Sequence, residues 1–514
     1  MRPEAYPHPV RAVRVLETHI SWVLLTGDYA YKVKKPVNLG FLDFSTLEAR
    51  RRCCEEELRL NRRLAPDLYL EVVAIRGVPA QARIGGDGPA LEYAVRMREF
   101  PQNALAKSMI SRGQLTAQHV DELASVIAAF HTAAPVAAGS DRHGEPETVL
   151  APALENFRQT LPLVAAAADR RMLRSLRAWT KSEHGRRAPD IAARRRDGFA
   201  RECHGDLHLG NVAVLDGKPV AFDCIEFNAA LRWIDVMNEV AFMHMDLDDR
   251  GRPDLAWRFL NRYLEHTGDY PGVAVLRFYG VYRALVRAKV HALRASQPRL
   301  AAKERARLLA ACRGYVRLAG RLARRPRPGL IITHGLSGSG KTTVTDVLVE
   351  RTGAVRVRSD LERKRLHGMP ARARSESAIA GGIYAPAASA ATYDRLAALA
   401  RGIVESGYTA VVDAAFLSGA ARRKFRTLAR RLRAGFVILD FRAPESVLSE
   451  RIAQRLRSAH DASEADLAVL EHQVATADPL ARDEIRAAIA VDTTRPVQWP
   501  RLLARLRRAG IGPR

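Results

Sequence analysis

The sequence predicts a chain of two folded parts, an α+β domain of two lobes followed by an α/β domain with a parallel sheet. Alternating strand-like runs fill residues 12–100, and helical periodicity fills most of residues 101–322. From residue 329 onward, apolar runs of strand length alternate with helical segments, which is typical of a parallel sheet. We therefore expect one domain over residues 1–322, a basic, proline-interrupted linker over residues 323–328 and a second domain over residues 329–514.

The composition favours a folded protein with a strongly basic surface. Of the 514 residues, 47% are hydrophobic and 27% are charged, and the formal net charge is +26. Such a charge raises nucleic acid as a partner. Most cations are arginines spread along alanine-rich helices, however, and aromatic residues make up only 6%, unlike single-strand binding platforms. We favour solvated arginine faces and phosphate substrates, with nucleic acid as a possible but less favoured partner.

Cysteine usage and the terminus predict a cytoplasmic protein. The five cysteines form no CxxC pair and no metal-ligand spacing: Cys53, Cys54, Cys203, Cys224 and Cys312. An odd, scattered set is typical of a reducing compartment. The N-terminal segment lacks an apolar signal core, and no run of about 18 apolar residues occurs, so we expect no membrane segment.

Two strand-like runs around a Gly-Asp turn, ISWVLL and YAYKVKK, predict a hairpin near the start of the chain. Lys32 and Lys34 project from the same face of its second strand. A helix follows, with a capping box of Ser45 as N-cap and Glu48, and it carries three glutamates, residues 55–57. Charged residues at such positions usually face solvent, and the pattern alone does not choose between the lysines or between the glutamates.

The motif HGDLHLGN, His204–Asn211, brings three oxygen-bearing side chains together. Asp206 and Asn211 have a DxxxxN spacing, and a hairpin of VAVL and KPVAF returns Asp223 to the same end. Phosphoryl transfer needs one carboxylate to accept the proton of the attacking hydroxyl, and an amide with a second carboxylate to hold Mg²⁺. Asp206, Asn211 and Asp223 fit those roles in that order.

The segment HGDLHLGN followed by FDCIEF resembles the catalytic loop and metal-binding segment of the aminoglycoside phosphotransferase and choline kinase family, which has the protein-kinase-like fold. The resemblance is specific at residues 203–226, and the order of parts covers residues 20–320. It implies that Asp206 is the catalytic base and that Asn211 and Asp223 are magnesium ligands.

The same resemblance implies that Lys32, in YAYK, holds the ATP phosphates and that Glu57 pairs with it. Two features depart from protein kinases: DCIEFN stands in place of DFG, and no GxGxxG loop precedes Lys32. Both are compatible with the antibiotic and choline kinase branches. The missing loop leaves a weakly active or inactive first lobe as an alternative.

The motif GLSGSGKT, residues 335–342, matches the phosphate-binding pattern GxxxxGK(S/T). It follows the apolar run Leu330–Thr333 and opens into a helical pattern, which is the strand, loop and helix that such a site requires. Lys341 can reach the outer phosphates of ATP, and Thr342 can ligate Mg²⁺. We expect ATP contacts from the residues of this loop: Gly335, Ser337, Gly338, Ser339, Gly340, Lys341, Thr342 and Thr343.

Polar residues at the ends of two later strands complete the predicted second site. Asp360 ends AVRVRSD about twenty residues after Lys341, and we expect Asp360 and Arg363 to bind the acceptor. Asp413 ends YTAVVD as a carboxylate for the magnesium shell.

Residues 447–475 predict a helical flap that carries Arg451 and Arg455 four positions apart, aimed at the ATP phosphates.

The second half resembles the small-molecule P-loop kinases of the gluconate kinase, shikimate kinase and polynucleotide kinase type, over residues 328–500. In that family the aspartate after the second strand contacts or activates the acceptor hydroxyl, and lid arginines clamp ATP. The resemblance therefore implies those roles for Asp360, Arg451 and Arg455. The sensor and arginine finger of ring-forming AAA-type ATPases have no firm counterpart here, so the label ATPase would be generic.

Taken together, the sequence predicts an ATP- and Mg²⁺-dependent phosphotransferase, a bifunctional kinase-like fusion acting on a small hydroxylated metabolite, with Asp206, Lys341 and Asp360 as catalytic residues. One alternative is a nucleic-acid-end kinase or repair factor, supported by the net charge and the segment Ser359–Arg363. Another is a nucleotide-sensing regulator with an inactive first lobe. The sequence leaves open the acceptor, the oligomeric state and whether both domains are active.

Overall fold

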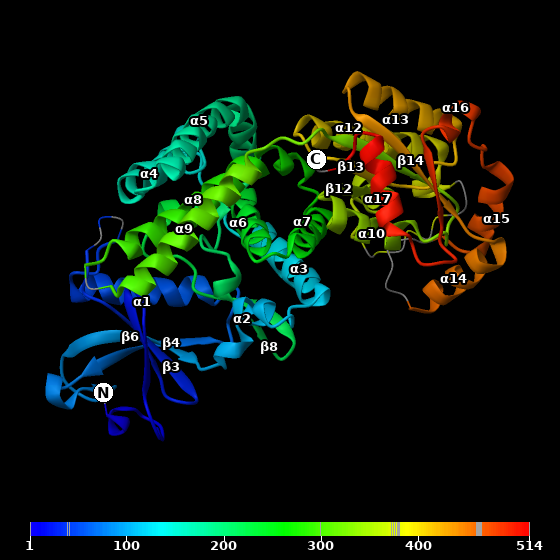
Figure 1. Cartoon of the computed structure of the whole chain (residues 1–514). Coiled ribbons are helices and arrows are strands. Elements are labelled where there is room, and N and C mark those ends of the chain that lie inside the picture. The colour runs from blue at the N-terminus through cyan, green and yellow to red at the C-terminus, as the bar shows by residue number, and fades with distance from the viewer. Residues whose placement is uncertain are drawn as a thin grey trace. The chain divides into compact units, whose positions relative to one another are not determined.

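The computed structural model describes residues 2–38, 40, 42–298, 300–371, 373, 375, 377, 381–458 and 465–512 (Figure 1). The chain divides into two compact units. The first comprises Met1–Asp246 and Tyr282–Arg313, and the second comprises Leu247–Val281 and Gly314–Arg514. The boundary falls inside three helices: α6 (Val236–Asp249), α8 (Val273–Ala295) and α9 (Ala302–Leu322).

The first unit begins with an antiparallel sheet in the order β1-β2-β3-β6-β4-β5. Its strands are β1 (Arg14–Glu17), β2 (Ser21–Leu25), β3 (Tyr29–Lys34), β4 (Tyr69–Arg76), β5 (Arg83–Ile84) and β6 (Ala90–Arg98). The predicted hairpin is the β2–β3 pair, with Val23 opposite Lys32. Helix α1 (Leu47–Asn61) packs against β4 and β6, so its inner face shares a core with the sheet.

The start of α1 differs by one residue from the prediction. Thr46 Oγ1 accepts a hydrogen bond from the Ala49 N–H at 3.1 Å, so Thr46 is the N-cap and the prediction of Ser45 was wrong. The Ser45 N–H donates instead to Asp43 Oδ1 at 2.9 Å. Either hydroxyl can cap a helix, and the turn in which Asp43 binds the Ser45 N–H leaves Thr46 as the cap.

Helices dominate the rest of the first unit. They are α2 (Ala106–Ser111), α3 (Ala117–Ala133), α4 (Pro146–Thr160), α5 (Ala167–Arg196) and the first-unit parts of α6, α8 and α9. Two short strand pairs lie among them: β7 (Ala200–Glu202) with β10 (Trp233–Asp235), and β8 (Val212–Leu215) with β9 (Lys218–Ala221). The β8–β9 pair is the predicted hairpin between Asn211 and Asp223.

The second unit is built on a parallel sheet in the order β12-β13-β11-β14-β15. Its strands are β11 (Gly329–His334), β12 (Val355–Arg358), β13 (Ala410–Asp413), β14 (Gly435–Arg442) and β15 (Ala488–Asp492). Helices α10 (Lys341–Thr352) and α17 (Trp499–Arg508) share one apolar core with the strands. Helices α12 (Pro386–Glu405) and α13 (Gly419–Arg431) also pack against the sheet, α12 on β11, β12 and β13 and α13 on β11 and β14 (Figure 1).

The remaining helices of the second unit are α7 (Pro253–Thr267), α11 (Ser359–Leu366), α14 (Glu445–Ser458), α15 (Leu467–Thr476) and α16 (Arg482–Ile485). Between α9 and β11, residues 323–328 form no helix or strand. Among the helices that the structure describes, none is long and apolar enough to cross a membrane.

Candidate active sites

Lys32, on β3, contacts two carboxylates with its ammonium group. Its Nζ donates to Glu57 Oε1 of α1 at 2.7 Å and to the Asp223 carboxylate. Lys34, two positions along the same face, donates to both Glu57 and Glu226. The structure therefore brings Lys32, Glu57 and Asp223 together, and it gives the second lysine a partner, Glu226, that sequence reasoning missed.

Burial makes the pairing of these charges necessary. Lys34 and Glu57 are both 0% exposed, and a buried charge is tolerated only when it is paired. Burial favours the neutral form of each group, but the attraction of Asp223 and Glu57 raises the pKa of Lys32 well above its usual range. Against the same burial, the two lysines lower the pKa of Glu57 below its usual range. Lys32 and Glu57 are therefore both charged throughout the physiological pH range, whereas burial raises the pKa of Glu226.

The loop that starts at His204 is held by a buried carboxylate of α6. Glu239 accepts hydrogen bonds from the His204 N–H at 3.1 Å and from the Gly205 N–H at 2.6 Å. Gly205 has φ +88°, and a Cβ there would lie 2.9 Å from the Leu231 carbonyl oxygen, so glycine is required. These contacts fix the backbone immediately before Asp206.

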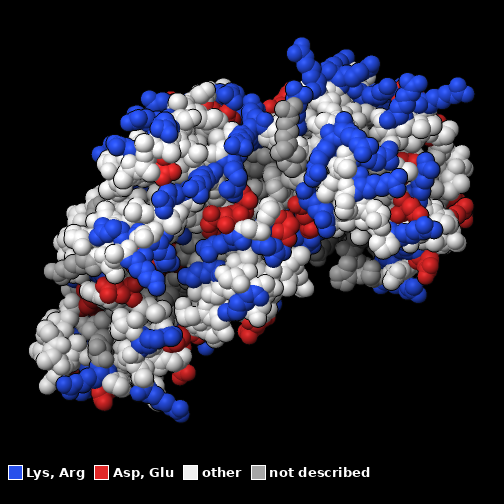
Figure 2. Space-filling view, viewed as in Figure 1, with Lys and Arg blue, Asp and Glu red and all other residues white. Residues whose placement is uncertain are grey.

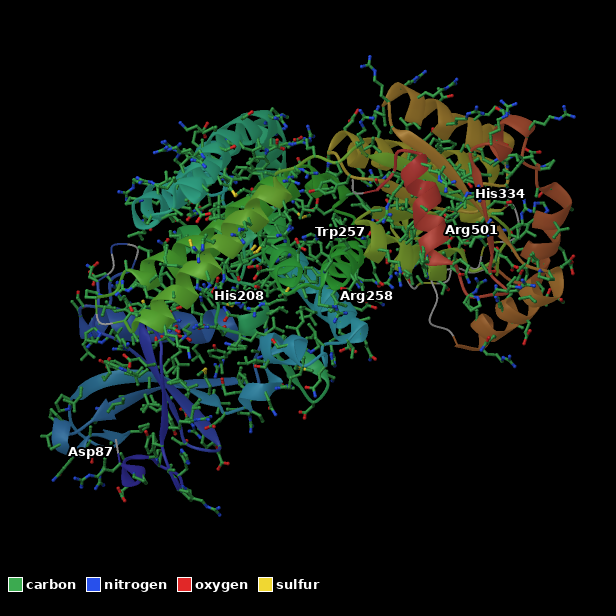
Figure 3. The ribbon with its side chains drawn as sticks, viewed as in Figure 1. Asp87, His208, Trp257, Arg258, His334 and Arg501 are labelled. Atoms are coloured by element: carbon green, nitrogen blue, oxygen red, sulfur yellow. The ribbon has the colours of Figure 1, made fainter. Side chains whose placement is uncertain are left out.

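Asp206 presents a partly exposed carboxylate, with 37% of its side chain accessible. Asn211 Nδ2 donates to Asp206 Oδ2 at 3.1 Å, and His208 Nε2 lies 3.4 Å from the same oxygen (Figure 3 labels His208). The Gly210 N–H donates to His208 Nδ1 at 2.9 Å, so the proton of a neutral His208 is on Nε2, facing Asp206. Burial would raise the pKa of Asp206, but His208 and Arg287 lower it below its usual range. Asp206 is thus an ionised group that can accept a proton.

Backbone contacts align the segments that hold Asn211 and Asp223. The Phe222 N–H donates to the Asn211 carbonyl at 2.9 Å, and His204 Nε2 lies 2.8 Å from the Phe222 carbonyl oxygen. Asp223 itself has φ +67°, a left-handed conformation that costs energy in a residue other than glycine. Asn211 and Asp223 carry an amide oxygen and a carboxylate, the kinds of ligand that Mg²⁺ prefers.

A second cluster near the same loop has metal-ligand chemistry. Ligand atoms of His131, Cys203 and Glu239 all lie within 4.8 Å of one another. The Glu239 carboxylate, however, already pairs with His131 at 2.8 Å and with two backbone amides. We interpret this cluster as the support of the loop.

In the second unit, Lys341 opens α10 and its Nζ lies inside the loop that precedes it. It donates to the carbonyl oxygens of Gly335 at 2.9 Å and Leu336 at 2.7 Å. Burial lowers the pKa of Lys341 to about 8, although Asp413 and Asp360 partly offset this effect. Gly338 has φ +78°, and a Cβ there would lie 2.7 Å from the Leu448 carbonyl oxygen, so the loop needs glycine at that position.

Thr342 and Asp413 meet beside this loop. Thr342 Oγ1 donates to Asp413 Oδ2 at 3.0 Å, and Thr345 Oγ1 lies 3.1 Å from the same oxygen. Asp413 is 5% exposed and ends β13, as the sequence predicted. The hydroxyl and carboxylate oxygens fit Mg²⁺ at this place as well.

The other residues predicted for the P-loop lie in varied environments. Ser339 is buried, and Thr343 is exposed on the first turn of α10. The Ser337 N–H donates to Gln473 Oε1 of α15 at 2.8 Å, so one backbone donor of the loop already has a protein acceptor. Gly335 and Gly340 both have positive φ, as a loop that turns its N–H groups inward requires.

The predicted flap arginines differ in their partners. Arg451 Nη1 donates to the Gly338 carbonyl at 3.3 Å and to Thr493 Oγ1 at 3.0 Å, so it contacts the P-loop directly. Arg455 Nη2 donates to the Ala465 carbonyl at 2.5 Å. Residues 459–464 of the predicted flap, between α14 and α15, lie outside the described residues.

Asp360 and Arg363 lie on α11, one turn apart. The charge of Asp360 raises the pKa of Lys341, against the effect of burial. Arg363 is 8% exposed and donates to the Ile383 carbonyl at 2.7 Å and to Ser389 Oγ at 3.2 Å. Arg363 therefore has protein partners that the sequence did not suggest.

Comparison with known families and sequences gives two family matches and full-length relatives. The model described as "Phosphotransferase enzyme family" matches residues 43–279, and the model described as "AAA domain" matches residues 330–480. Uncharacterized protein Rv2004c of Mycobacterium tuberculosis (strain ATCC 25618 / H37Rv) is 31% identical over 493 residues, which cover 92% of this chain and 95% of the relative. Uncharacterized protein Mb2027c of Mycobacterium bovis (strain ATCC BAA-935 / AF2122/97) matches with the same figures.

Solved structures similar to parts of this chain include two kinases. A gluconokinase from Sinorhizobium meliloti 1021 is 27% identical, with a TM-score of 0.23, and the match covers 36% of this chain and 91% of that chain. The amicoumacin kinase hAmiN, in complex with AMP-PNP, Ca²⁺ and Ami, is 12% identical with a TM-score of 0.37 over 63% of this chain and 89% of that chain. The family matches confirm both resemblances that the motifs predicted. The predicted fold class, a kinase-like domain followed by a P-loop domain with a parallel sheet, is confirmed as well.

Proposed function

The chain belongs to the same family as these mycobacterial proteins and is a phosphotransferase by its domains, and we propose that it is a cytoplasmic, ATP- and Mg²⁺-dependent kinase acting on the hydroxyl group of a small metabolite. The observation that carries this proposal is the arrangement in the first unit. Lys32, Glu57 and Asp223 are joined by ion pairs, and Asp206 and Asn211 lie on the loop held against the Asp223 segment. We place the domain boundaries as the sequence suggests, with the linker at residues 323–328.

In the first site, Asp206 accepts the proton of the acceptor hydroxyl as that oxygen attacks the γ-phosphate. Its ionised state and its exposure suit this role. Lys32 binds the ATP phosphates, and Glu57 holds its ammonium group in place. Asn211 and Asp223 would hold Mg²⁺, whose charge, when bound, offsets that of the phosphates.

In the second site, Lys341 and the backbone N–H groups of residues 335–343 bind the phosphates of ATP, and Arg451 joins them from α14. Thr342 and Asp413 would hold Mg²⁺ there. Asp360, at the carboxyl end of β12, orients or deprotonates a second acceptor hydroxyl, and we assign Arg363 and Arg455 to acceptor and ATP contacts respectively. A protein with two such sites is bifunctional, or one site regulates the other.

The test is transfer of labelled γ-phosphate from ATP into a cytosolic small-molecule extract by the wild type, Asp206→Asn and Lys341→Ala. We expect a labelled product that one of the two variants fails to form, which assigns the reaction to one domain. Asp216→Asn is the matched control, because Asp216 is exposed in the turn of the β8–β9 hairpin and undergoes the same chemical change. Release of free phosphate alone, or no consumption of ATP, by the wild type would contradict the proposal.

A kinase acting on nucleic-acid ends is the second candidate, and a basic groove between α12 and α13 favours it. Its lining includes four exposed cations and one carboxylate, Asp394, which pairs with Lys424; the cations are Arg401, Arg423, Lys424 and Arg431. Figure 2 shows Lys and Arg side chains gathered over the place where α13 lies in Figure 1. Binding of a labelled DNA or RNA end that falls steeply between low and moderate salt, and that Arg423→Glu weakens, would favour this candidate. No retention on heparin or DNA would exclude it.

A further inference from the structure

Helix α7 lies in the segment that the phosphotransferase family model matches, yet it packs in the same compact unit as the P-loop sheet. Its contacts there are with α10 and β12. Trp257, Asn261 and Glu265 are spaced four residues apart and therefore share one face of α7. Figure 3 labels Trp257, at the start of this face. Each of the three side chains contacts a residue of the P-loop domain, residues 329–514.

Asn261 completes the free edge of the parallel sheet. β12 is an edge strand and pairs only with β13 among the described strands. Asn261 Nδ2 donates to the Ala354 carbonyl at 3.0 Å, and its Oδ1 accepts from the Arg356 N–H at 2.7 Å. The side-chain amide thus supplies one donor and one acceptor, as a neighbouring strand would. This contact fixes β12 against α7.

Glu265 binds the side chain of Arg356, which is completely buried. Glu265 Oε1 accepts from Arg356 Nε at 3.1 Å and from Nη2 at 2.5 Å. Asp346 of α10 lies 2.6 Å from the same Nη2. The guanidinium therefore lies between a carboxylate from α7 and one from the P-loop helix.

The other side of Arg356 faces the predicted metal ligands. Its Nη1 donates to Thr345 Oγ1 at 2.9 Å and to the Thr342 carbonyl at 3.2 Å. Thr345 Oγ1, which accepts from Arg356, lies 3.1 Å from Asp413 Oδ2 and 3.1 Å from the Thr342 carbonyl oxygen, and its proton is shared between these two acceptors. Arg356 Nη1 is itself 3.9 Å from Asp413 Oδ2. An unbroken chain of contacts thus runs from Glu265 through Arg356 and Thr345 to Asp413.

We propose that Glu265 is a positioning residue of the P-loop magnesium site, so that the second nucleotide site is completed by a residue that precedes it by about seventy positions. Glu265 orients the Arg356 guanidinium and balances its charge. Without that carboxylate, Arg356 keeps Asp346 as its one close carboxylate partner among the described residues, and its guanidinium can turn toward Asp413 and compete with a cation for the same oxygen. The inference rests on the proposed function, because it assumes that Thr342 and Asp413 hold Mg²⁺ with a nucleotide.

The test compares ADP binding by the full-length wild type, Glu265→Gln and Glu350→Gln over a range of Mg²⁺ concentrations, by calorimetry. Binding that Lys341→Ala removes defines the contribution of the P-loop. Glu350→Gln is the matched control, since Glu350 pairs with Arg258 of α7 at 2.6 Å and has no contact with Arg356. We expect Glu265→Gln to raise the Mg²⁺ concentration for half-maximal binding about tenfold, the size usual for a residue that supports a metal ligand. Glu350→Gln should behave as the wild type does.

Glu265→Asp keeps the charge with a shorter side chain, and we expect it to restore part of the Mg²⁺ affinity. It also serves as the test variant if Glu265→Gln does not fold, because it should then need a Mg²⁺ concentration severalfold above that of the wild type. An unchanged Mg²⁺ requirement in the folded Glu265 variants overturns the inference alone. Wild-type protein whose ADP binding is unaffected by Lys341→Ala overturns the proposed function of the P-loop, and the inference with it.

Discussion

The two nucleotide sites hold their lysines in opposite ways. Lys32 pairs with the carboxylates of Glu57 and Asp223, whereas Lys341 donates to backbone carbonyl oxygens and has a carboxylate only at longer range. In the first site the positive charge is fully compensated before a ligand arrives, so ATP phosphates must compete with side chains. In the second site carbonyl dipoles and more distant carboxylates compensate the charge only in part, and burial lowers the pKa of Lys341 to about 8. The same residue type therefore has different sensitivities to pH and mutation.

The largest expected effect is the loss of phosphate transfer at the first site alone when Asp206 is changed. Asp206→Asn removes the group that accepts the hydroxyl proton, and we expect phosphate transfer at the first site to fall roughly 10²- to 10⁴-fold. The reaction assigned to Lys341 should be unchanged. Product analysis with labelled ATP measures both rates, and a loss of both in Asp206→Asn would contradict the independence of the sites.

Within the first site, the two lysines should differ in their effect on stability. Lys34→Met leaves Glu57 and Glu226 without their common partner in a fully buried position, and we expect a loss of about 3–5 kcal/mol in the free energy of unfolding. Lys32→Met should cost less, because Glu57 keeps Lys34 and Asp223 is 42% exposed. Urea unfolding of the full chain measures both values. Equal losses of unfolding free energy in the two variants would contradict the expectation that the ion pairs of Lys34 stabilise the fold more than those of Lys32.

The pH dependence of nucleotide binding should be a property of the second site. The Lys341 ammonium is charged below about pH 8 and loses its proton above it, so its attraction for phosphate should weaken up to about tenfold per pH unit above that point. The first site should show no such change between about pH 6 and 9, since the pKa of Lys32 is raised and that of Glu57 is lowered. Calorimetry in buffers of different ionisation enthalpy should detect proton uptake on binding above pH 8 that Lys341→Arg abolishes. A pH-independent affinity at the second site would contradict this assignment.

The smallest effect concerns the arginine that reaches the P-loop from α14. Arg451→Ala removes its bonds to Gly338 and Thr493, and we expect nucleotide binding to weaken by about 1 kcal/mol, roughly fivefold in Kd. Arg457→Ala, an exposed arginine of the same helix, is the control and should have no effect. Equal nucleotide affinities of the two variants would show that Arg451 does not contribute to nucleotide binding.

Local sequence was enough to predict the parts of each site that are close in the chain. Residues 335–342 and the strand and helix around them form a contiguous unit, and the hairpin between Asn211 and Asp223 is set by its own Asp-Gly turn. The families of both halves could be named from these motifs, and the family matches confirm them. The predicted cap Ser45 was wrong by one residue, because its neighbour Thr46 also has a hydroxyl that can cap a helix.

What the sequence determined by itself is therefore the two phosphate-handling motifs and the order of the elements that carry them, because hydrophobic period and turn chemistry act over a few residues. Only the tertiary structure decided the partners of buried charges. Lys34 meets Glu226, and Arg356 meets Glu265, across 192 and 91 positions. In a sequence these residues are indistinguishable from solvated charges, because periodicity gives the face of an element and not the element that will cover it. They stay charged when buried because the attraction between specific side chains, brought together by folding, offsets the cost of removing the charges from water.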